Sequence, residues 1–278
     1  MSRTFAGAVG AVLFVCLVIA PAARCASPIA DKNLDAAIRA VLFDPKGDLT
    51  EEMLKNVFVL KADGKPGKEV KDLTGLEKCI NLAEFKASNN QITDLKALKG
   101  LTNLQSLDLS GNQIVDVSPL AGLNKLQYIE LSKNKVADIS PLKDLTALSA
   151  LYLSENQVAD IGPLAGLIKL SSLSLSKNKI KDLTPLAKVN RLMVLDLNEN
   201  QIVDVAPLKS QGELSMLMLE KNKITDVSPL VAAAEADAKG AKRFAPFLRL
   251  WLAGNPLSED AKKTQLSALK AAGVRLQD

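Results

Sequence analysis

The chain has no histidine, which removes the commonest general base and a frequent metal ligand. Of its three cysteines, Cys16 and Cys25 lie in or beside an N-terminal apolar segment. Cys79 alone cannot form an internal disulfide or a zinc site, so we expect a buried, inert thiol. The sequence shows no nucleophile–base arrangement, phosphate-binding loop or metal-ligand spacing. It therefore predicts a protein that is not an enzyme and that uses no cofactor and no metal.

Charge of one sign is also not in excess, since 35 basic and 31 acidic side chains give a formal net charge of +4. The lysines are spread evenly along the sequence instead of forming a basic stretch. A nucleic-acid-binding protein needs a concentrated positive surface that neutralises phosphates. The sequence therefore predicts no nucleic-acid partner.

Residues 1–25 have the organisation of a secretory signal peptide. Arg3 supplies a short basic region, and residues 6–20 are apolar or small. This apolar run is short for a membrane-spanning helix, which needs about 20 residues. We expect cleavage between Ala23 and Ala26, no membrane span in the mature chain, and a secreted, periplasmic or cell-envelope location.

The dominant feature that is present is an asparagine that recurs every 22 residues. The regular column consists of Asn90, Asn112, Asn134, Asn156, Asn178, Asn200 and Asn222. Residues 101–122 show the surrounding pattern, LTNLQSLDLSGNQIVDVSPLAG, and Asn255 continues it after a longer gap. A fixed period of this length is typical of a solenoid, in which each unit buries its apolar side by stacking on its neighbours.

Each repeat divides into a strand, a turn and a return limb. In the strand at residues 106–110, Leu107 and Leu109 point inward while the alternating polar residues point outward. The asparagine that follows is predicted to bond backbone groups of its own turn and of the next repeat. Asp116 and Pro119 then suit the start of a brief 3₁₀ turn. The repeated aspartates are therefore interpreted as structural residues, not as calcium or acid–base residues.

The segments that flank the repeats are predicted to be caps, which shield the apolar ends of a solenoid. Residues 31–42 place Leu34 and Ile38 on one helical face behind Asp31 as N-cap, and Thr50 can cap a second short helix. The predicted division of the chain is a signal peptide at 1–25, a helical N-terminal cap at 26–56, repeats at 57–257 with a degenerate first repeat at 57–78 and a helical insertion at about 231–243, and a C-terminal cap at 258–278 with a helix and a last strand.

The repeats at residues 101–122 and 123–144 resemble the 22-residue leucine-rich repeats of bacterial internalins. The helical segment before the repeats is similar to the N-terminal cap of that family, and the resemblance covers residues 28–278. It implies an α/β leucine-rich-repeat solenoid, a curved horseshoe with a parallel sheet on the concave side and 3₁₀ or short helical limbs on the convex side. It also implies that the concave sheet binds other proteins.

The outward strand positions differ in residue type from one repeat to the next. Both tyrosines and the single tryptophan lie there, together with two methionines. Rigid aromatic side chains and methionine on a surface are frequent at binding hot spots. The candidate partner-binding residues are Tyr128, Glu130, Tyr152, Val194, Asp196, Met216, Met218, Arg249 and Trp251. The alternative is that these side chains only cover neighbouring strands, with Trp251 packed under the C-terminal cap.

Protein binding is the functional hypothesis that the outward residues favour. Eight regular strands give a face roughly 35–40 Å long, which is enough for a standard protein interface. Two other hypotheses are a structural envelope or matrix component without a dedicated ligand, and a polysaccharide binder that stacks sugars on the aromatic rings. The sequence therefore predicts a secreted or periplasmic binding module, expected to be monomeric, that recognises a protein through its concave sheet.

Overall fold

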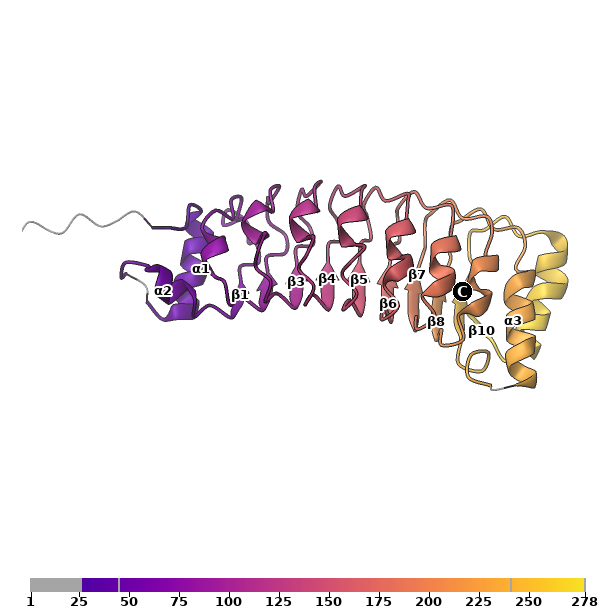
Figure 1. Cartoon of the computed structure of the whole chain (residues 1–278). Coiled ribbons are helices and arrows are strands. Elements are labelled where there is room, and N and C mark those ends of the chain that lie inside the picture. The colour runs from indigo at the N-terminus through magenta and orange to yellow at the C-terminus, as the bar shows by residue number, and fades with distance from the viewer. Residues whose placement is uncertain (1–26, 45, 241, 278) are drawn as a thin grey trace, which may run out of the picture.

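The chain forms one curved rod in which the strands stack in chain order (Figure 1). This computed structural model describes residues 27–44, 46–240 and 242–277. The predicted signal peptide lies outside the described residues. The predicted leucine-rich-repeat solenoid is confirmed, with a parallel sheet on one side and short helical turns on the other.

The strands form a single sheet of ten in which each neighbouring pair is parallel. Their bounds are β1 Val59–Lys61, β2 Glu84–Lys86, β3 Ser106–Asp108, β4 Tyr128–Glu130, β5 Ala150–Tyr152, β6 Ser172–Ser174, β7 Val194–Asp196, β8 Met216–Met218, β9 Arg249–Trp251 and β10 Arg275–Gln277. Strands β2 to β9 are the eight regular strands, and β1 and β10 extend the sheet at its two ends. Paired residues are offset by 22 from β2 to β8, by 25 between β1 and β2, and by 33 between β8 and β9. The repeat units near each end of the rod therefore contain more residues than the regular 22.

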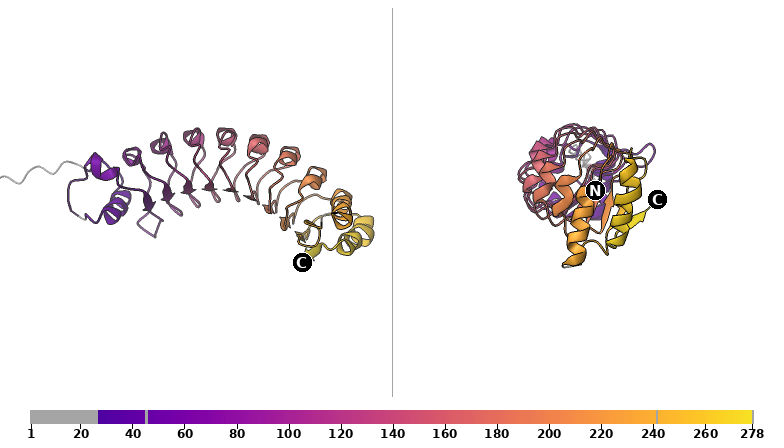
Figure 2. Two further views of the ribbon diagram at one scale, coloured as in Figure 1. Left: turned by 60° about the horizontal axis from the view of Figure 1, so that its bottom comes forward. Right: turned by 90° about the vertical axis from the view of Figure 1, so that its right-hand side faces the viewer.

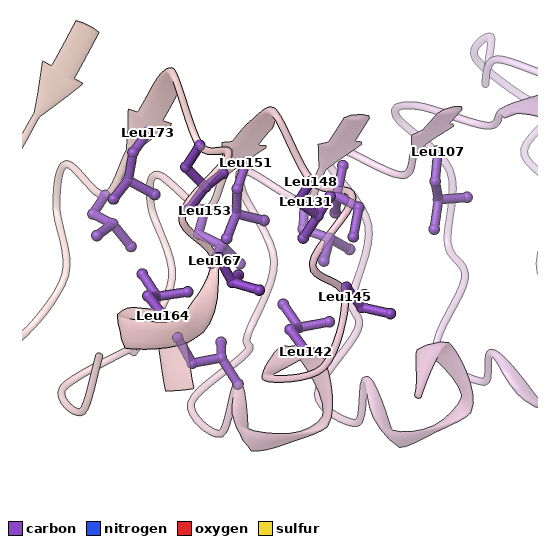
Figure 3. Packing of buried hydrophobic residues seen from close by; sticks show 14 of the residues in the cluster. Leu107, Leu131, Leu142, Leu145, Leu148, Leu151, Leu153, Leu164, Leu167 and Leu173 are labelled. Carbon is purple, nitrogen blue, oxygen red and sulfur yellow. The ribbon is translucent and has the colours of Figure 1, made fainter. Parts of the chain in front are cut away.

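The core lies between the sheet and the return limbs (Figure 3). Leu151 and Leu173 point inward from the strands toward Leu142 and Leu164 of the return limbs, and all four side chains are fully buried. Removing each such side chain from water contributes about 1.5–3 kcal/mol. Because the buried residues form one continuous cluster, each repeat depends on its neighbours to cover its apolar side.

The buried asparagines form a continuous column along one corner of the rod, which we call the asparagine column. Asn134 donates from Nδ2 to the carbonyl oxygens of Leu109 and Leu131, both at 2.9 Å, and its Oδ1 accepts from the Ile114 N–H at 3.0 Å. Leu109 and Ile114 belong to the preceding repeat, so the prediction that the side chain reaches the next repeat is wrong in direction. The column satisfies backbone groups that this corner would otherwise leave unpaired.

The predicted 3₁₀ turns on the return limbs are confirmed. They span Leu76–Lys78, Lys96–Leu98, Ser118–Leu120, Ser140–Leu142, Gly162–Gly166, Thr184–Lys188 and Ala206–Ser210. Asp116 Oδ1 accepts from the Ser118 N–H at 2.8 Å, and Pro119 lies in the first turn, as the sequence indicates. The next limb is the helix α3 (Ser228–Lys239), where a helical insertion was expected.

The rod curves with its sheet on the inner side and its helical turns on the outer side (Figure 2). Neighbouring strands lie about 4.8 Å apart, whereas packed helices need about 8–10 Å. The limbs lengthen from three residues at Ser118–Leu120 to five at Ala206–Ser210 and 12 in α3, so the outer side needs more space toward the C-terminal end. Curvature accommodates this difference and makes the sheet face concave.

Helical caps close both ends, as predicted. At the N-terminal end, α1 (Lys32–Leu42) begins after Asp31, whose carboxylate accepts from two backbone N–H groups of the helix. A short helix, α2 (Glu51–Leu54), follows with Thr50 as its N-cap. At the C-terminal end, a π-helical turn at Ala261–Gln265 leads into α4 (Leu266–Ala271) and then into β10.

One residue that the pattern assigns to the interior lies on the surface. Counting back from Asn255 places Phe247 in the core, but Phe247 is 60% exposed and Leu248 is fully buried. The irregular segment that follows α3 shifts the register by one residue before β9. The regular spacing therefore identifies the wrong residue at this position.

Candidate partner-binding surface

The concave face consists of the outward side chains of strands that each contribute only three residues. In β4, the inward Ile129 is fully buried, while Tyr128 and Glu130 on either side of it are half-buried. The same alternation holds along the sheet because successive side chains of a strand point to opposite faces. Register then decides which outward side chains are neighbours, since each strand lies beside the next one in the chain.

Two tyrosines and two carboxylates gather over β3, β4 and β5, and we call them the tyrosine cluster. The rings of Tyr128 and Tyr152 are tilted by 48° with their centroids 5.6 Å apart, although the two residues belong to different strands. The Tyr152 hydroxyl lies 3.0 Å from the Ser172 hydroxyl, within hydrogen-bonding distance. Aromatic pairs of this geometry are favourable. The cluster is completed by Glu130, opposite Tyr152, and by Asp108, opposite Glu130.

The carboxylates of the tyrosine cluster are close together and partly removed from water. The pKa of Glu130 is raised above its usual value because burial penalises the charged form, and the Asp108 carboxylate acts in the same direction. Burial also raises the pKa of Tyr128 to about 12, with further contributions from Glu130 and Asp108. Within the described residues, neither carboxylate forms an ion pair. The cluster therefore carries negative charge beside two aromatic rings.

The second group of candidate residues lies over β7, β8 and β9, and we call it the methionine–tryptophan patch. Register pairs Val194 with Met216 and Met216 with Arg249 in one row. A parallel row runs through Asp196, Met218 and Trp251. The Arg249 guanidinium lies 5.9 Å from the centroid of the Trp251 ring, within the range of a cation–π contact. The patch is largely apolar, with one acidic and one basic side chain.

The candidate residues thus lie in two separate groups on the sheet face, the tyrosine cluster and the methionine–tryptophan patch. Strand β6 separates the groups and presents Ser172 and Ser174 outward. A hydrogen bond from the Ser174 hydroxyl to the Asp196 carboxylate at 3.1 Å continues the polar strip between them. Trp251 is half-buried on the sheet face, in register with Gln277 of the last strand.

Asp108 is part of the tyrosine cluster although the sequence did not single it out. Its carboxylate accepts from the Ser110 N–H at 3.1 Å and from the Ser110 hydroxyl at 2.8 Å. The order of the outward column, in which Asp108 directly precedes Glu130, is the signal that could have identified it. The charge of Asp108 alone did not identify it, because repeated aspartates elsewhere in the chain only stabilise turns.

Among the described residues there is little support for metal binding, for a reactive thiol or for a membrane-spanning helix. No group of three or more histidine, cysteine, aspartate or glutamate side chains there could hold a metal ion. Cys79 is fully buried, and burial raises the pKa of its thiol to about 12, so it is not a reactive thiolate at neutral pH. In the part of the chain that the structure describes, no helix has both the length and the apolar character that crossing a membrane requires.

Sequence and structure comparisons agree with the repeat architecture. A family model for leucine-rich repeats (2 copies) matches residues 80–122, 102–144, 124–166 and 146–188. No curated protein sequence matches the chain significantly. Solved structures with the same fold are numerous, and three of them are informative.

The first is an internalin C2 of Listeria monocytogenes, which is 36% identical with a TM-score of 0.70 over 73% of this chain and 92% of its own. The second is an internalin, inlF, of the same species, at 28% identity and a TM-score of 0.74, covering 93% of this chain and 79% of its own. The third is a leucine-rich-repeat protein of Leptospira interrogans, at 20% identity and a TM-score of 0.64 over 82% of this chain and 62% of its own, which shows the shared fold.

Proposed function

Since this chain belongs to the internalin-type leucine-rich-repeat family, we propose that it is a non-enzymatic module that binds another protein through its concave sheet. The observation that carries the proposal is the placement of the scarce aromatic residues. Both tyrosines and the tryptophan of the chain lie half-buried on the concave face, where the repeat itself does not require them. Aromatic residues and methionine are enriched in the centres of protein interfaces.

The two groups suit different parts of a partner. The tyrosine cluster combines ring faces with two carboxylates that lack ion-pair partners among the described residues, so it suits a basic side chain of the partner. The methionine–tryptophan patch suits an apolar side chain, because Met216 and Met218 can adapt their shape to it. Ten strands about 4.8 Å apart make a face about 43 Å long, which accommodates both contacts in one interface.

We also propose that the protein acts outside the cytoplasm. The support is the order of basic, apolar and small residues in the first 25 positions. N-terminal sequencing of the exported protein should give a first residue between Arg24 and Ser27. A product that retains Met1 or the apolar segment would contradict export by a cleaved signal.

The binding proposal is tested by affinity capture from the native cell envelope with the purified chain as bait. Tyr128→Ala with Tyr152→Ala should weaken the captured protein's affinity by at least about 2 kcal/mol, or roughly 30-fold in Kd. Met218→Ala with Trp251→Ala should have an effect of similar size. Ile168→Ala with Val203→Ala is the matched control, because these apolar residues are 55% and 56% exposed and lie outside the strands.

The outcome that contradicts the proposal is a captured protein whose binding is lost in the control pair and kept in both concave-face pairs. If the envelope supplies no partner that distinguishes these variants, the structural role is favoured instead. Polysaccharide binding is the second candidate, because Tyr128, Tyr152 and Trp251 could stack on sugar rings. A glycan array probed with the chain and with the tyrosine pair variant separates that function from protein binding.

A further inference from the structure

A groove beside the N-terminal cap carries three lysines that form no ion pair among the residues that the structure describes. It lies between α1 and the segment after β1, has a volume of about 350 Å³, and is lined chiefly by Asn33, Ala36, Ala37, Lys61, Lys65 and Lys68. None of these residues belongs to the tyrosine cluster or the methionine–tryptophan patch. We infer that this groove is a binding site for a phosphorylated ligand about the size of a sugar phosphate.

Lys65 and Lys68 lie on a loop that interrupts the regular repeat, and Lys61 ends the strand β1 before it. The loop comprises residues 63–69, where the offset between β1 and β2 is 25 instead of 22. Asn90 closes both ends of it, because its Nδ2 donates to the Ala62 carbonyl at 2.8 Å and its Oδ1 accepts from the Val70 N–H at 2.7 Å. Insertions in solenoid repeats are often placed on binding faces. Here the asparagine column holds the insertion in one conformation.

Further contacts fix the loop against its surroundings. The Gly64 N–H donates to the Ser88 carbonyl at 2.7 Å, and a Cβ at Gly64 would lie only 1.8 Å from the Asn89 carbonyl oxygen. Only glycine permits this close approach of two backbone segments. On the other side, Asn33 Nδ2 donates to the Glu69 carbonyl at 2.9 Å and ties the loop to α1. The lysines therefore project from a rigid support.

The charge of the groove is unbalanced. Lys61, Lys65 and Lys68 are exposed and form no ion pair within the described residues, whereas Lys55 of the cap and Lys78 of the first repeat are paired with Glu52 and Glu51. The one acidic side chain in the lining is Asp63, and its Oδ1 accepts from the Ser88 N–H and hydroxyl, both at 2.9 Å. A doubly charged phosphate offers acceptors to several ammonium groups and relieves their mutual repulsion.

The size and the walls of the groove indicate more than a bare ion. Small-molecule sites have volumes of about 300–1,000 Å³, so a cavity of about 350 Å³ has room for a ring in addition to a phosphate. Ala36 and Ala37 of α1 add a small apolar part to the lining. This combination suits a sugar ring that carries a phosphate group, either free or as the headgroup of a lipid.

The test is calorimetric titration of the purified chain with glucose 6-phosphate, with inorganic phosphate and with glucose. Glucose 6-phosphate should bind in a saturable manner, inorganic phosphate more weakly and glucose not at all. Lys61→Gln, Lys65→Gln and Lys68→Gln combined should weaken the binding at least tenfold. The matched control combines Lys143→Gln, Lys188→Gln and Lys209→Gln, which removes the same charge from the return limbs and should leave the binding unchanged.

Gly64→Ala separates a built site from a merely basic surface, because it displaces the loop without changing its charge. It should reduce the binding while circular dichroism stays that of the parent; if this variant does not fold, the two lysine combinations decide. Equal losses in both combinations, no saturable binding of any phosphorylated probe, or unchanged binding in a folded Gly64→Ala variant would overturn the inference. Vesicles of phosphatidylinositol phosphate in phosphatidylcholine form the last arm. Binding to these vesicles without binding to the soluble probes would support the inference and assign the phosphate to a lipid headgroup.

Discussion

The inward and outward faces of the sheet are built from adjacent residues, yet they follow different rules. The middle residue of each strand from β2 to β8 is apolar and fully buried, namely Phe85, Leu107, Ile129, Leu151, Leu173, Leu195 and Leu217. The next residue outward changes with each strand, in the order Lys86, Asp108, Glu130, Tyr152, Ser174, Asp196 and Met218. Packing in a repeating core constrains the inward residues. The outward residues are constrained instead by what the face contacts.

The asparagine column extends this comparison from packing to hydrogen bonding. From Asn112 to Asn222, each side chain bonds one backbone N–H and the same two buried carbonyls, because the corner of the rod has the same shape in each regular repeat. Nothing comparable constrains Tyr128 or Trp251. Substitutions inside should therefore change stability, and substitutions outside should change recognition.

The largest expected effect on stability comes from Asn156→Ala. The variant leaves the buried Val136 N–H without its partner. It also removes one of two side-chain donors from the Leu131 and Leu153 carbonyls, which keep Asn134 and Asn178 respectively. We expect a loss of about 2–3 kcal/mol in the free energy of unfolding, measured in urea. Ser154→Ala, two residues earlier on the open face, loses only contacts with the hydroxyls of Ser174 and Ser176 and should cost less than about 1 kcal/mol. Equal losses would remove the distinction between inside and outside.

A smaller effect is expected at the N-terminal cap, from Asp31→Ala. Asp31 accepts from the Asn33 and Leu34 N–H groups of α1 and from the Lys71 N–H of the first repeat, so its loss should cost about 1–2 kcal/mol at pH 7. Although burial raises its pKa, these hydrogen bonds outweigh burial and hold the pKa of Asp31 below its ordinary value.

The contribution of Asp31 therefore depends on pH in a defined direction. It is fully present above the unfolded-state pKa of about 3.9 and is lost as the pH falls through the lower folded-state pKa. Parallel urea titrations of the parent and Asp31→Ala at pH 7 and near pH 2 should show the difference shrink in acid. A difference that grows in acid would contradict this role.

On the concave face, Glu130→Gln should have the opposite effect and stabilise the protein at neutral pH. Since the folded-state pKa of Glu130 is raised, the wild type loses stability as the pH rises from the unfolded-state pKa through the folded-state pKa. Glutamine can still accept the hydrogen bond from the Ser132 N–H. Thermal midpoints should favour the variant at pH 7 and converge below about pH 4. A variant that is less stable at pH 7 would show that Glu130 serves the fold.

The smallest predicted effect concerns Lys133, which has a φ of 59° in the turn before Asn134. Gly111 and Gly254 hold the equivalent turn position with positive φ and without strain. Lys133→Gly should therefore stabilise the protein by about 0.5–1 kcal/mol. Lys135→Gly, which lies just past the turn, should destabilise it by a similar amount, and thermal unfolding of both variants compares the two.

Sequence alone was sufficient for the parts of the molecule that repeat. The alternation around Leu107 and Leu109, the 3₁₀ turn at Pro119 and the helix N-cap at Asp31 each follow from local rules, so these elements could be predicted. The direction in which the asparagine side chains reach could not be predicted, because the preceding and the following repeat have the same sequence pattern. Phe247 was misplaced because the register shift before β9 leaves no mark in the spacing.

The candidate surface was less accessible to prediction for a physical reason. The sequence places Tyr128, Tyr152 and Trp251 outward, but it does not show which outward side chains touch. The diagonal contact between the tyrosine rings and the position of Asp108 beside Glu130 depend on strand register and side-chain direction. The loop at residues 63–69 was hidden in a degenerate repeat, since it is closed by Asn90 from the following repeat.

Hydroxyl-radical footprinting of the chain, free and bound to the protein captured from the envelope, tests the central claim most directly. Methionine and aromatic side chains are the most reactive ones, and the chain supplies them in contrasting positions. The account predicts that binding protects Tyr152, Met218 and Trp251 on the concave face, while Met193, which is 53% exposed outside the strands, stays labelled. Protection of Met193 with unchanged labelling of all three concave-face residues would contradict it.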